Sequence, residues 1–286
     1  MRGGGVAVIV VASAVGWAAP SRGNDLDSEH LFGVTEGSDI GNSGERELEL
    51  EAGGRFGKRS GAYSVFSQTA ALKLNLTDSF RFSPVLGVDH HRIRSVPDLG
   101  DRNASAFGEF AFEMKYRALD RRTAPVGLTF AAIPNWRPID DTSGARVTSF
   151  GASFAAMADR ELIVNRLFAA LNVSFDTGAS RLHATRVWQH TSGLGASGAL
   201  SLRLGERVFA GTEVRFESAF GGMALDRFAG HAWFAGPSLY MRIADNAWIS
   251  VVWNAQVSGH AAGDARALDL VNFERHLVKG RLGIAF

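Results

Sequence analysis

The chain has 286 residues, with 30 Lys and Arg against 29 Asp and Glu, and it contains no cysteine. The net charge of +1 argues against an extended nucleic-acid surface, so no nucleic-acid partner is expected. The lack of cysteine excludes a disulfide framework, thiol catalysis and cysteine–metal sites.

The N-terminus has the pattern of an export signal. Positions 1–2 carry a positive charge, residues 6–15 form an apolar run, and small residues surround a cleavage point near Ala18 or Ala19. The run is too short to span a bilayer as a helix, and no later stretch approaches the ~18 apolar residues that a membrane helix needs. We therefore predict a cleaved signal peptide over residues 1–19. The mature chain is then either a soluble exported protein or a β-barrel.

Residues 20–44 are polar, charged and glycine-containing. We predict that they form a periplasmic N-terminal lead-in, partly mobile. Residues 45–286 then form one domain.

From residue 45 onward, apolar and polar side chains alternate in short segments. Leu48 and Leu50, for example, alternate with Glu47, Glu49 and Glu51. Period-two alternation is typical of strands with one apolar face. The pattern occurs at about 45–52, 66–76, 80–89, 109–117, 126–132, 149–156, 163–176, 200–204, 208–217, 233–243, 248–257 and 278–286.

The connections alternate in length. Short turns are expected near Asp78, Asp120, Asp159, Glu206 and Asp245, and longer polar loops near 53–61, 90–105, 134–145, 177–192, 218–228 and 258–268. Transmembrane barrels show this alternation, with an even number of strands and both ends on the periplasmic side. A soluble β-sandwich does not require it. The sequence therefore predicts an all-β fold, a single transmembrane antiparallel β-barrel of about twelve strands.

The final strand has an apolar face that ends in an aromatic residue. Leu282, Ile284 and Phe286 alternate with Arg281, Gly283 and Ala285. This strand resembles the C-terminal insertion signal of bacterial outer-membrane β-barrels. The mature chain as a whole resembles Gram-negative outer-membrane barrels of the porin-like or putative transporter kind. The resemblance implies an outer-membrane location, contact with outer-membrane lipid or lipopolysaccharide, and insertion by the barrel-assembly machinery.

If the apolar face meets lipid, the opposite face lines the interior. We expect these charged side chains to line a pore: Glu109, Glu113, Lys115, Arg117, Arg166, Arg203, Glu213, Arg215, Glu217, Arg242, Lys279 and Arg281. Charges in a lumen must be hydrated or paired, because an isolated buried ion costs several kcal/mol. The set is compatible either with a hydrated pore for small polar solutes or with an ion-pair network that fills a narrow barrel.

His190-Thr191-Ser192-Gly193 is the one enzymatic candidate. It resembles the His-x-Ser element of outer-membrane phospholipase A, a family in which an amide side chain orients the histidine. A serine nucleophile needs a base within reach and a group that orients that base. His190 and Ser192 share the lipid-facing side with Leu200, but the outward positions predicted on the next strand include no Asn, Asp or Glu. A non-catalytic rim segment, with Trp188 in an aromatic girdle, fits better.

Metal and cofactor sites are not expected. His90 and His91 are adjacent, and adjacent residues on an extended chain point to opposite faces. No glycine-rich phosphate loop, zinc motif or calcium loop occurs in the sequence. The leading hypothesis is a passive, porin-like channel without enzymatic activity. A structural barrel with a plugged lumen comes second, and a phospholipase-like hydrolase using His190 and Ser192 comes third.

Overall fold

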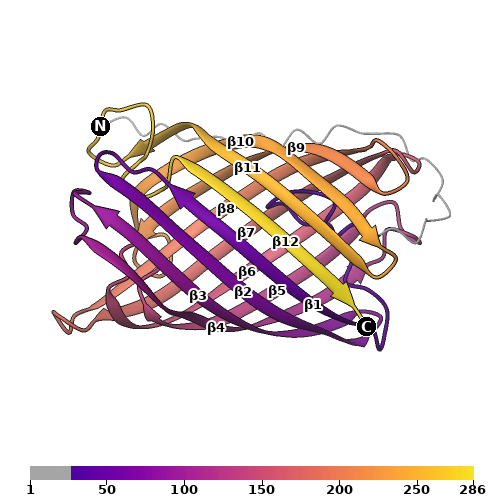
Figure 1. Ribbon diagram of the computed structural model, residues 1–286, viewed down its shortest axis with the longest axis horizontal. Coiled ribbons are helices and arrows are strands. Elements are labelled where there is room, and N and C mark those ends of the chain that lie inside the picture. The colour runs from indigo at the N-terminus through magenta and orange to yellow at the C-terminus, as the bar shows by residue number, and fades with distance from the viewer. Residues whose placement is uncertain (1–26) are drawn as a thin grey trace, which may run out of the picture.

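The computed structural model describes residues 27–286; the predicted signal peptide and the first residues of the expected lead-in lie outside this range. No helix in the described part of the chain is long and apolar enough to cross a membrane. Residues 27–286 contain twelve strands (Figure 1): β1 (Arg46–Phe56), β2 (Ala62–Thr77), β3 (Phe80–Arg94), β4 (Arg102–Leu119), β5 (Gly127–Ile139), β6 (Arg146–Ile163), β7 (Leu167–Leu182), β8 (Trp188–Arg203), β9 (Val208–Gly221), β10 (Arg227–Ala244), β11 (Ala247–Ala261) and β12 (His276–Ala285).

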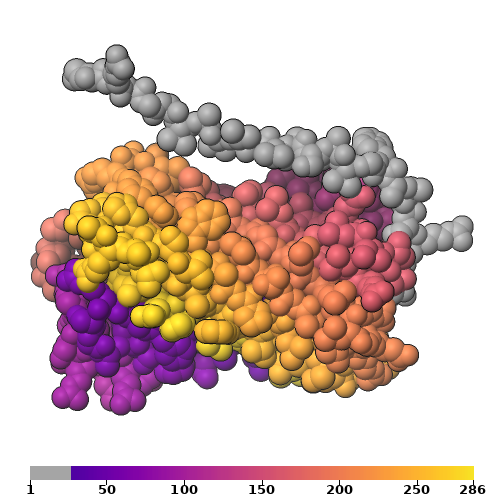
Figure 2. All heavy atoms as spheres, turned by 90° about the horizontal axis from the view of Figure 1, so that it is seen from above, coloured from indigo at the N-terminus to yellow at the C-terminus, as the bar shows by residue number. Residues whose placement is uncertain are grey.

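The strands close into one antiparallel barrel. Each strand pairs with its neighbours in sequence, and β12 returns to pair with β1, with Leu50 opposite Leu282. The Phe286 amide donates to the Arg46 carbonyl at 2.9 Å, so the first and last strands start and finish at the same end of the barrel. Figure 2 shows the early strands in indigo and the late strands in yellow as one continuous surface. Closure leaves no unpaired sheet edge, and the predicted fold class is confirmed.

The outer wall is apolar, as the alternation predicts. Leu171 and Val173 on β7, and Val278 and Ile284 on β12, are exposed. Trp188, which the sequence favours for an aromatic girdle, is exposed, and so are Trp136, Trp233 and Trp253. Large apolar side chains exposed around a closed barrel form the belt that a lipid bilayer covers.

Four of the five short connections lie where the sequence predicts them, at 78–79, 120–126, 204–207 and 245–246. The turn expected at Asp159 is wrong. β6 continues through Asp159, which pairs with Ala170, and the turn lies at 164–166. Asp159 is buried and faces inward, where its carboxylate accepts a hydrogen bond from the Ser38 amide at 3.1 Å. An aspartate that resembles a turn residue is therefore held in a strand by a partner inside the barrel.

Five of the six longer loops are shorter than expected, because the strands extend beyond the apolar belt; the sixth, at 262–275, is longer than the expected 258–268. β3 runs to Arg94 and β4 begins at Arg102, which places His90 and His91 in a strand. His91 is buried, whereas the half-buried His90 is hydrogen-bonded to Ser105 at 2.8 Å. Ladder hydrogen bonds do not require apolar side chains, so loss of the alternation does not mark the end of a strand.

The structure differs most from the sequence-based expectation in the N-terminal lead-in. Most of its described part lies inside the barrel, where Leu31, Phe32 and Ile40 are 1% exposed or less, whereas residues 42–44 are exposed. We call residues 27–40 the plug and residues 41–45 the linker. Apolar groups of this segment contact apolar side chains of the barrel wall, and its charged groups contact opposite charges there. Burial of the apolar groups is favourable, because it removes apolar surface from water.

Candidate functional site

The plug is a compact loop held by its own backbone. The Leu31 amide donates to the Ser28 carbonyl at 3.3 Å, and the Gly37 amide donates to the Glu29 carbonyl at 3.1 Å. A side chain at Gly37 would place its Cβ 2.4 Å from the Ser28 carbonyl oxygen, so this close approach of backbone requires glycine. The loop therefore presents consecutive side chains to different parts of the wall.

Glu29 carries the charged contact of the plug. Its carboxylate accepts hydrogen bonds from Arg81 Nη1 and Lys115 Nζ, each at 2.6 Å, and from Lys73 Nζ at 3.4 Å. These cations come from β3, β4 and β2, and Glu29 is 2% exposed. Burial alone would raise the pKa of the Glu29 carboxyl, but Arg81, Lys115 and Lys73 outweigh it and hold that pKa well below its usual range. Glu29 is thus an anion inserted among three cations of the wall.

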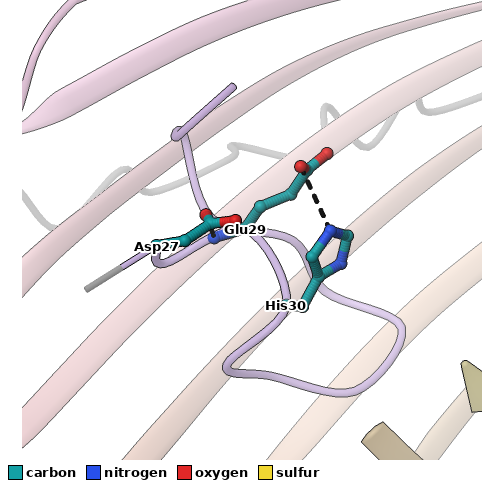
Figure 3. Close-up of side chains that lie close together, drawn as sticks. All are labelled: Asp27, Glu29 and His30. Atoms are coloured by element: carbon teal, nitrogen blue, oxygen red, sulfur yellow. Dashed lines mark hydrogen bonds and ion pairs between the residues drawn. The ribbon is translucent and has the colours of Figure 1, made fainter. Parts of the chain in front are cut away.

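His30 extends this cluster toward β1 and β11. Figure 3 shows Glu29 and His30 pointing toward each other, and His30 Nε2 lies 3.1 Å from Glu29 Oε2. The imidazole stacks on Trp248, with ring centroids 3.9 Å apart. Lys73 Nζ lies 2.9 Å from Glu47 Oε1 and 2.6 Å from Glu49 Oε2.

The same cluster offers ligand types that metal ions use. His30 lies close to Glu47 and Glu49, and also to Asp27 and Glu29 (Figure 3). Lys73 Nζ lies within 3.4 Å of three of these carboxylates and supplies the positive charge that a metal would otherwise bring. The observed contacts are those of an ion-pair network.

The other side of the plug is apolar. Leu31 and Phe32 form one buried cluster with aromatic residues of the wall, namely Phe168 on β7, Phe209 on β9, Tyr240 on β10 and Trp248 on β11. Burying side chains of this size stabilises a protein by about 1.5–3 kcal/mol each. The interior at this level is therefore a hydrophobic core, unlike the polar lumen that the alternation predicts.

Backbone hydrogen bonds tie the plug to further strands. Glu213 Oε2 on β9 accepts from the Val34 amide at 2.8 Å and the Thr35 amide at 3.1 Å. Arg281 Nη2 on β12 donates to the Gly33 carbonyl at 3.0 Å. With Glu29 at β2–β4 and Asp159 on β6, these contacts surround the plug. They lie toward the barrel end that holds the short turns, so the plug occupies the periplasmic half of the lumen.

Above the plug lies a cavity of about 600 Å³, which we call the outer cavity. Val34 and Glu36 of the plug line its base, and Asp141 and Phe273 of the opposite loops also line it. Small residues of β6–β8 form much of its wall: Ser149, Gly151, Ala152, Ser153, Ala155, Ser174, Gly178, Gly193, Gly195, Ala196 and Ser197. Small inward side chains leave the upper half of the lumen wide and polar.

Most of the charged residues predicted for the interior of the barrel do lie inside it, in one or the other half of the lumen. Lys115, Arg117, Glu213, Arg215 and Arg281 are buried. Ion pairs hold Glu109 with Arg137 at 2.6 Å, Glu217 with Arg215 at 2.6 Å, Lys279 with Glu51 at 3.0 Å and Glu113 with Arg81 at 2.9 Å.

Three predicted interior residues lie at the periplasmic rim. Arg203 ends β8 and donates to the Gly205 and Glu206 carbonyls, and Arg242 lies near the end of β10. Arg166 is exposed in the turn at 164–166, so it does not line the lumen. Its displacement follows from the wrong position of the predicted turn near Asp159.

Ser192 and His190 are not hydrogen-bonded to each other in the structure. Ser192 Oγ donates to the Gly222 carbonyl at 2.8 Å and accepts from the Leu225 amide at 2.9 Å. Ser192 is buried by these contacts, whereas His190 is exposed. The hydroxyl anchors the loop at 222–226, which is a structural role.

The sequence matches, over residues 24–286, the family described as "Family of unknown function (DUF6662)". The chain belongs to this family. A comparison with curated proteins gave no match for this DUF6662 chain.

Solved structures similar to this DUF6662 chain share its fold. The COG4313 outer-membrane channel from Pseudomonas putida F1 has a TM-score of 0.56 and 11% identity, covering 87% of this chain and 98% of that chain. The β-domain of the Bordetella autotransporter BrkA has a TM-score of 0.54 and 12% identity, covering 86% and 100%. The translocator domain of the autotransporter NalP from Neisseria meningitidis has a TM-score of 0.51 and 12% identity, covering 87% and 90%. The chain thus has the fold of Gram-negative outer-membrane β-barrels, and its apolar belt agrees with an outer-membrane location.

Proposed function

We propose that this protein is an outer-membrane channel for small polar solutes, closed from the periplasmic side by its own plug. The observation that carries the proposal is the insertion of Glu29 among Lys73, Arg81 and Lys115 below a polar cavity. A barrel filled only for stability has no need of a wide cavity above its filled half. A channel with a plug needs both.

The charged contacts of the plug lower the free-energy cost of its release. Burying an ion pair costs several kcal/mol of desolvation per ion, which offsets much of the attraction. When Glu29 leaves, water entering the lumen can hydrate both the carboxylate and the three cations. The apolar contacts of Leu31 and Phe32 keep the closed state favoured. The linker contains Gly41 and Gly44, both with positive φ, at 85° and 84°, so its backbone conformation suits a tight hinge.

Single-channel conductance tests this proposal. In planar bilayers, a variant that lacks residues 27–40 is expected to give discrete steps far more often than the whole protein. Heat-modifiable gel mobility establishes that both are folded. A folded variant without the plug that conducts no current contradicts the proposal.

A structural barrel with a plugged lumen is the alternative, favoured by the many ion pairs around Glu29. Under that alternative, removal of residues 27–40 lowers the thermal stability and produces no conductance. Insertion through the barrel-assembly machinery, with Leu282, Ile284 and Phe286 as the recognised residues, is part of our proposal. Phe286 is 70% exposed at the end of the last strand, where a partner could reach it.

A further inference from the structure

Basic side chains gather on the outer wall at the extracellular ends of β6, β7 and β8. Arg146 begins β6, Arg181 lies one residue before the end of β7, and His183 and Arg186 follow in the loop to β8. All four are exposed. We call them the outer basic patch.

The strand register brings these residues together on the outer face. Arg181 lies opposite Thr148 on β6 and opposite Trp188 on β8. The Arg181 guanidinium lies 5.4 Å from the centre of the Trp188 ring. The His183 amide donates to the Arg146 carbonyl at 3.0 Å, and the His183 ring is hydrogen-bonded to Thr148 Oγ1 at 3.1 Å. The patch is therefore continuous across two strands and a loop.

The patch lies directly above the apolar belt. On β6 the same outer face carries Phe154 and Phe150, which are 47% and 55% exposed, followed by Thr148 and Arg146. Residues two apart on a strand are separated by about 6.6 Å along it. Arg146 thus lies two such steps, about 13 Å along the strand, beyond Phe150, at the depth of lipid headgroups.

The arginines of the patch have no acidic partner. Among residues 27–286, no Asp or Glu forms an ion pair with Arg146, Arg181 or Arg186. Two other exposed arginines do have one, since Arg266 pairs with Asp264 and Arg207 pairs with Asp245. Arg92 and Arg94 on β3 are exposed as well and form no ion pair with the described residues. Three uncompensated cations at headgroup depth call for an external anion.

We propose that the outer basic patch binds the phosphate groups of lipopolysaccharide in the outer leaflet. Arginine is suited to this role, because its planar guanidinium donates two parallel hydrogen bonds to a phosphate. The short turns, the start of β1 and the end of β12 all lie at the opposite end of the barrel, so the patch faces the outer leaflet. The phosphorylated glycolipid of that leaflet carries the required negative charge. Phe150 and Phe154 would contact the acyl chains below. This inference does not depend on whether the barrel conducts.

The test is lipid-dependent thermal stability. The purified, folded barrel is heated in detergent with increasing lipopolysaccharide, and the unfolding midpoint is followed by heat-modifiable gel mobility. We expect lipopolysaccharide to raise the midpoint of the wild type, and the same lipid treated with phosphatase to raise it far less. Replacing both arginines, Arg146→Gln with Arg181→Gln, is expected to weaken the apparent affinity by about tenfold for each arginine, as for the loss of charge-assisted hydrogen bonds.

The matched control is Arg207→Gln, an exposed arginine at the periplasmic end, which should keep the wild-type affinity. The double variant should also stay close to the wild type in midpoint without lipid, since the two arginines make no ion pair and Arg181 loses only an exposed contact with the Trp188 ring. The proposal is overturned if the double variant keeps the wild-type response, or if dephosphorylated lipid stabilises the wild type equally well.

Discussion

The two halves of the lumen are built from the same strands, but the periplasmic half is filled and the extracellular half contains a cavity. In the periplasmic half, the wall turns large groups inward, such as Arg81, Lys115 and Phe209, and the plug satisfies them. In the extracellular half, β6–β8 turn small groups such as Gly151 and Ser174 inward and leave a cavity. The size of the inward side chains, more than their polarity, decides which half is filled. The lower half is filled as a protein core is, and one continuous segment, residues 27–40, fills it.

Reversing the charge of Glu29 should disrupt this division most. Glu29→Lys places a fourth cation among Lys73, Arg81 and Lys115, where breaking a buried pair costs about 3–5 kcal/mol. We expect the plug to leave the lumen and conductance steps to appear in planar bilayers. Glu206→Lys, in an exposed turn, is the control and should behave as the wild type. A closed, folded Glu29→Lys barrel would show that the charges do not hold the plug.

Removing the apolar anchor should loosen the plug without repelling it. Phe32→Ala leaves a cavity beside Phe168 and Phe209, and such truncations cost about 3–5 kcal/mol. We expect faster cleavage after Glu36 by a glutamate-specific protease, because Glu36 becomes accessible when the plug swings out. Phe150→Ala removes the same ring from the lipid face and should leave the cleavage rate unchanged. Equal cleavage rates for both variants would show that the contacts of Phe32 do not hold the plug in the lumen.

Filling the upper half should affect conduction and spare stability. Ser174 lines the outer cavity, while its neighbour Val173 is exposed on the outer wall. In the variant without residues 27–40, Ser174→Phe is expected to reduce the current of each step, and Val173→Phe is expected to leave it unchanged. If the two substitutions act alike, the current does not pass through the outer cavity.

The smallest expected effect is on ion selectivity. Arg215 lines the outer cavity and pairs with Glu217 at 2.6 Å. In the same background, Arg215→Gln removes a positive charge from the path and should shift the reversal potential in a salt gradient toward cations. Arg207→Gln, outside the lumen, should give no shift. A shift toward anions would contradict the assigned path.

Much of the barrel could be predicted from alternation. Successive side chains on a strand point to opposite faces, so the sequence pattern shows which side chains face the lipid and which face the lumen. It specified the lipid-facing Leu50 and Ile284 and the inward Lys115 and Glu213. The plug could not be predicted this way, since a short irregular segment has no period and its burial depends on groups far along the chain.

Two signals in the sequence did point to the plug. Leu31-Phe32 is an apolar pair in a polar segment, and large aromatic residues occupy inward positions near the periplasmic ends of the strands. These positions, Phe168, Phe209, Tyr240 and Trp248, are unfavourable in a hydrated lumen and require a covering partner. The turn was misplaced at Asp159 for the same reason, because the partner of that aspartate is far along the chain: its carboxylate accepts a hydrogen bond from the Ser38 amide of the plug.

A reversible crosslink between plug and wall tests the central claim most directly. The Thr35 hydroxyl donates to Ser197 Oγ at 2.9 Å, and the chain contains no cysteine of its own, so Thr35→Cys with Ser197→Cys introduces a single pair. The account predicts that the oxidised barrel is silent in a planar bilayer, and that adding a reductant to the same membrane produces conductance steps. Equal conductance before and after reduction would contradict a plug that gates this barrel.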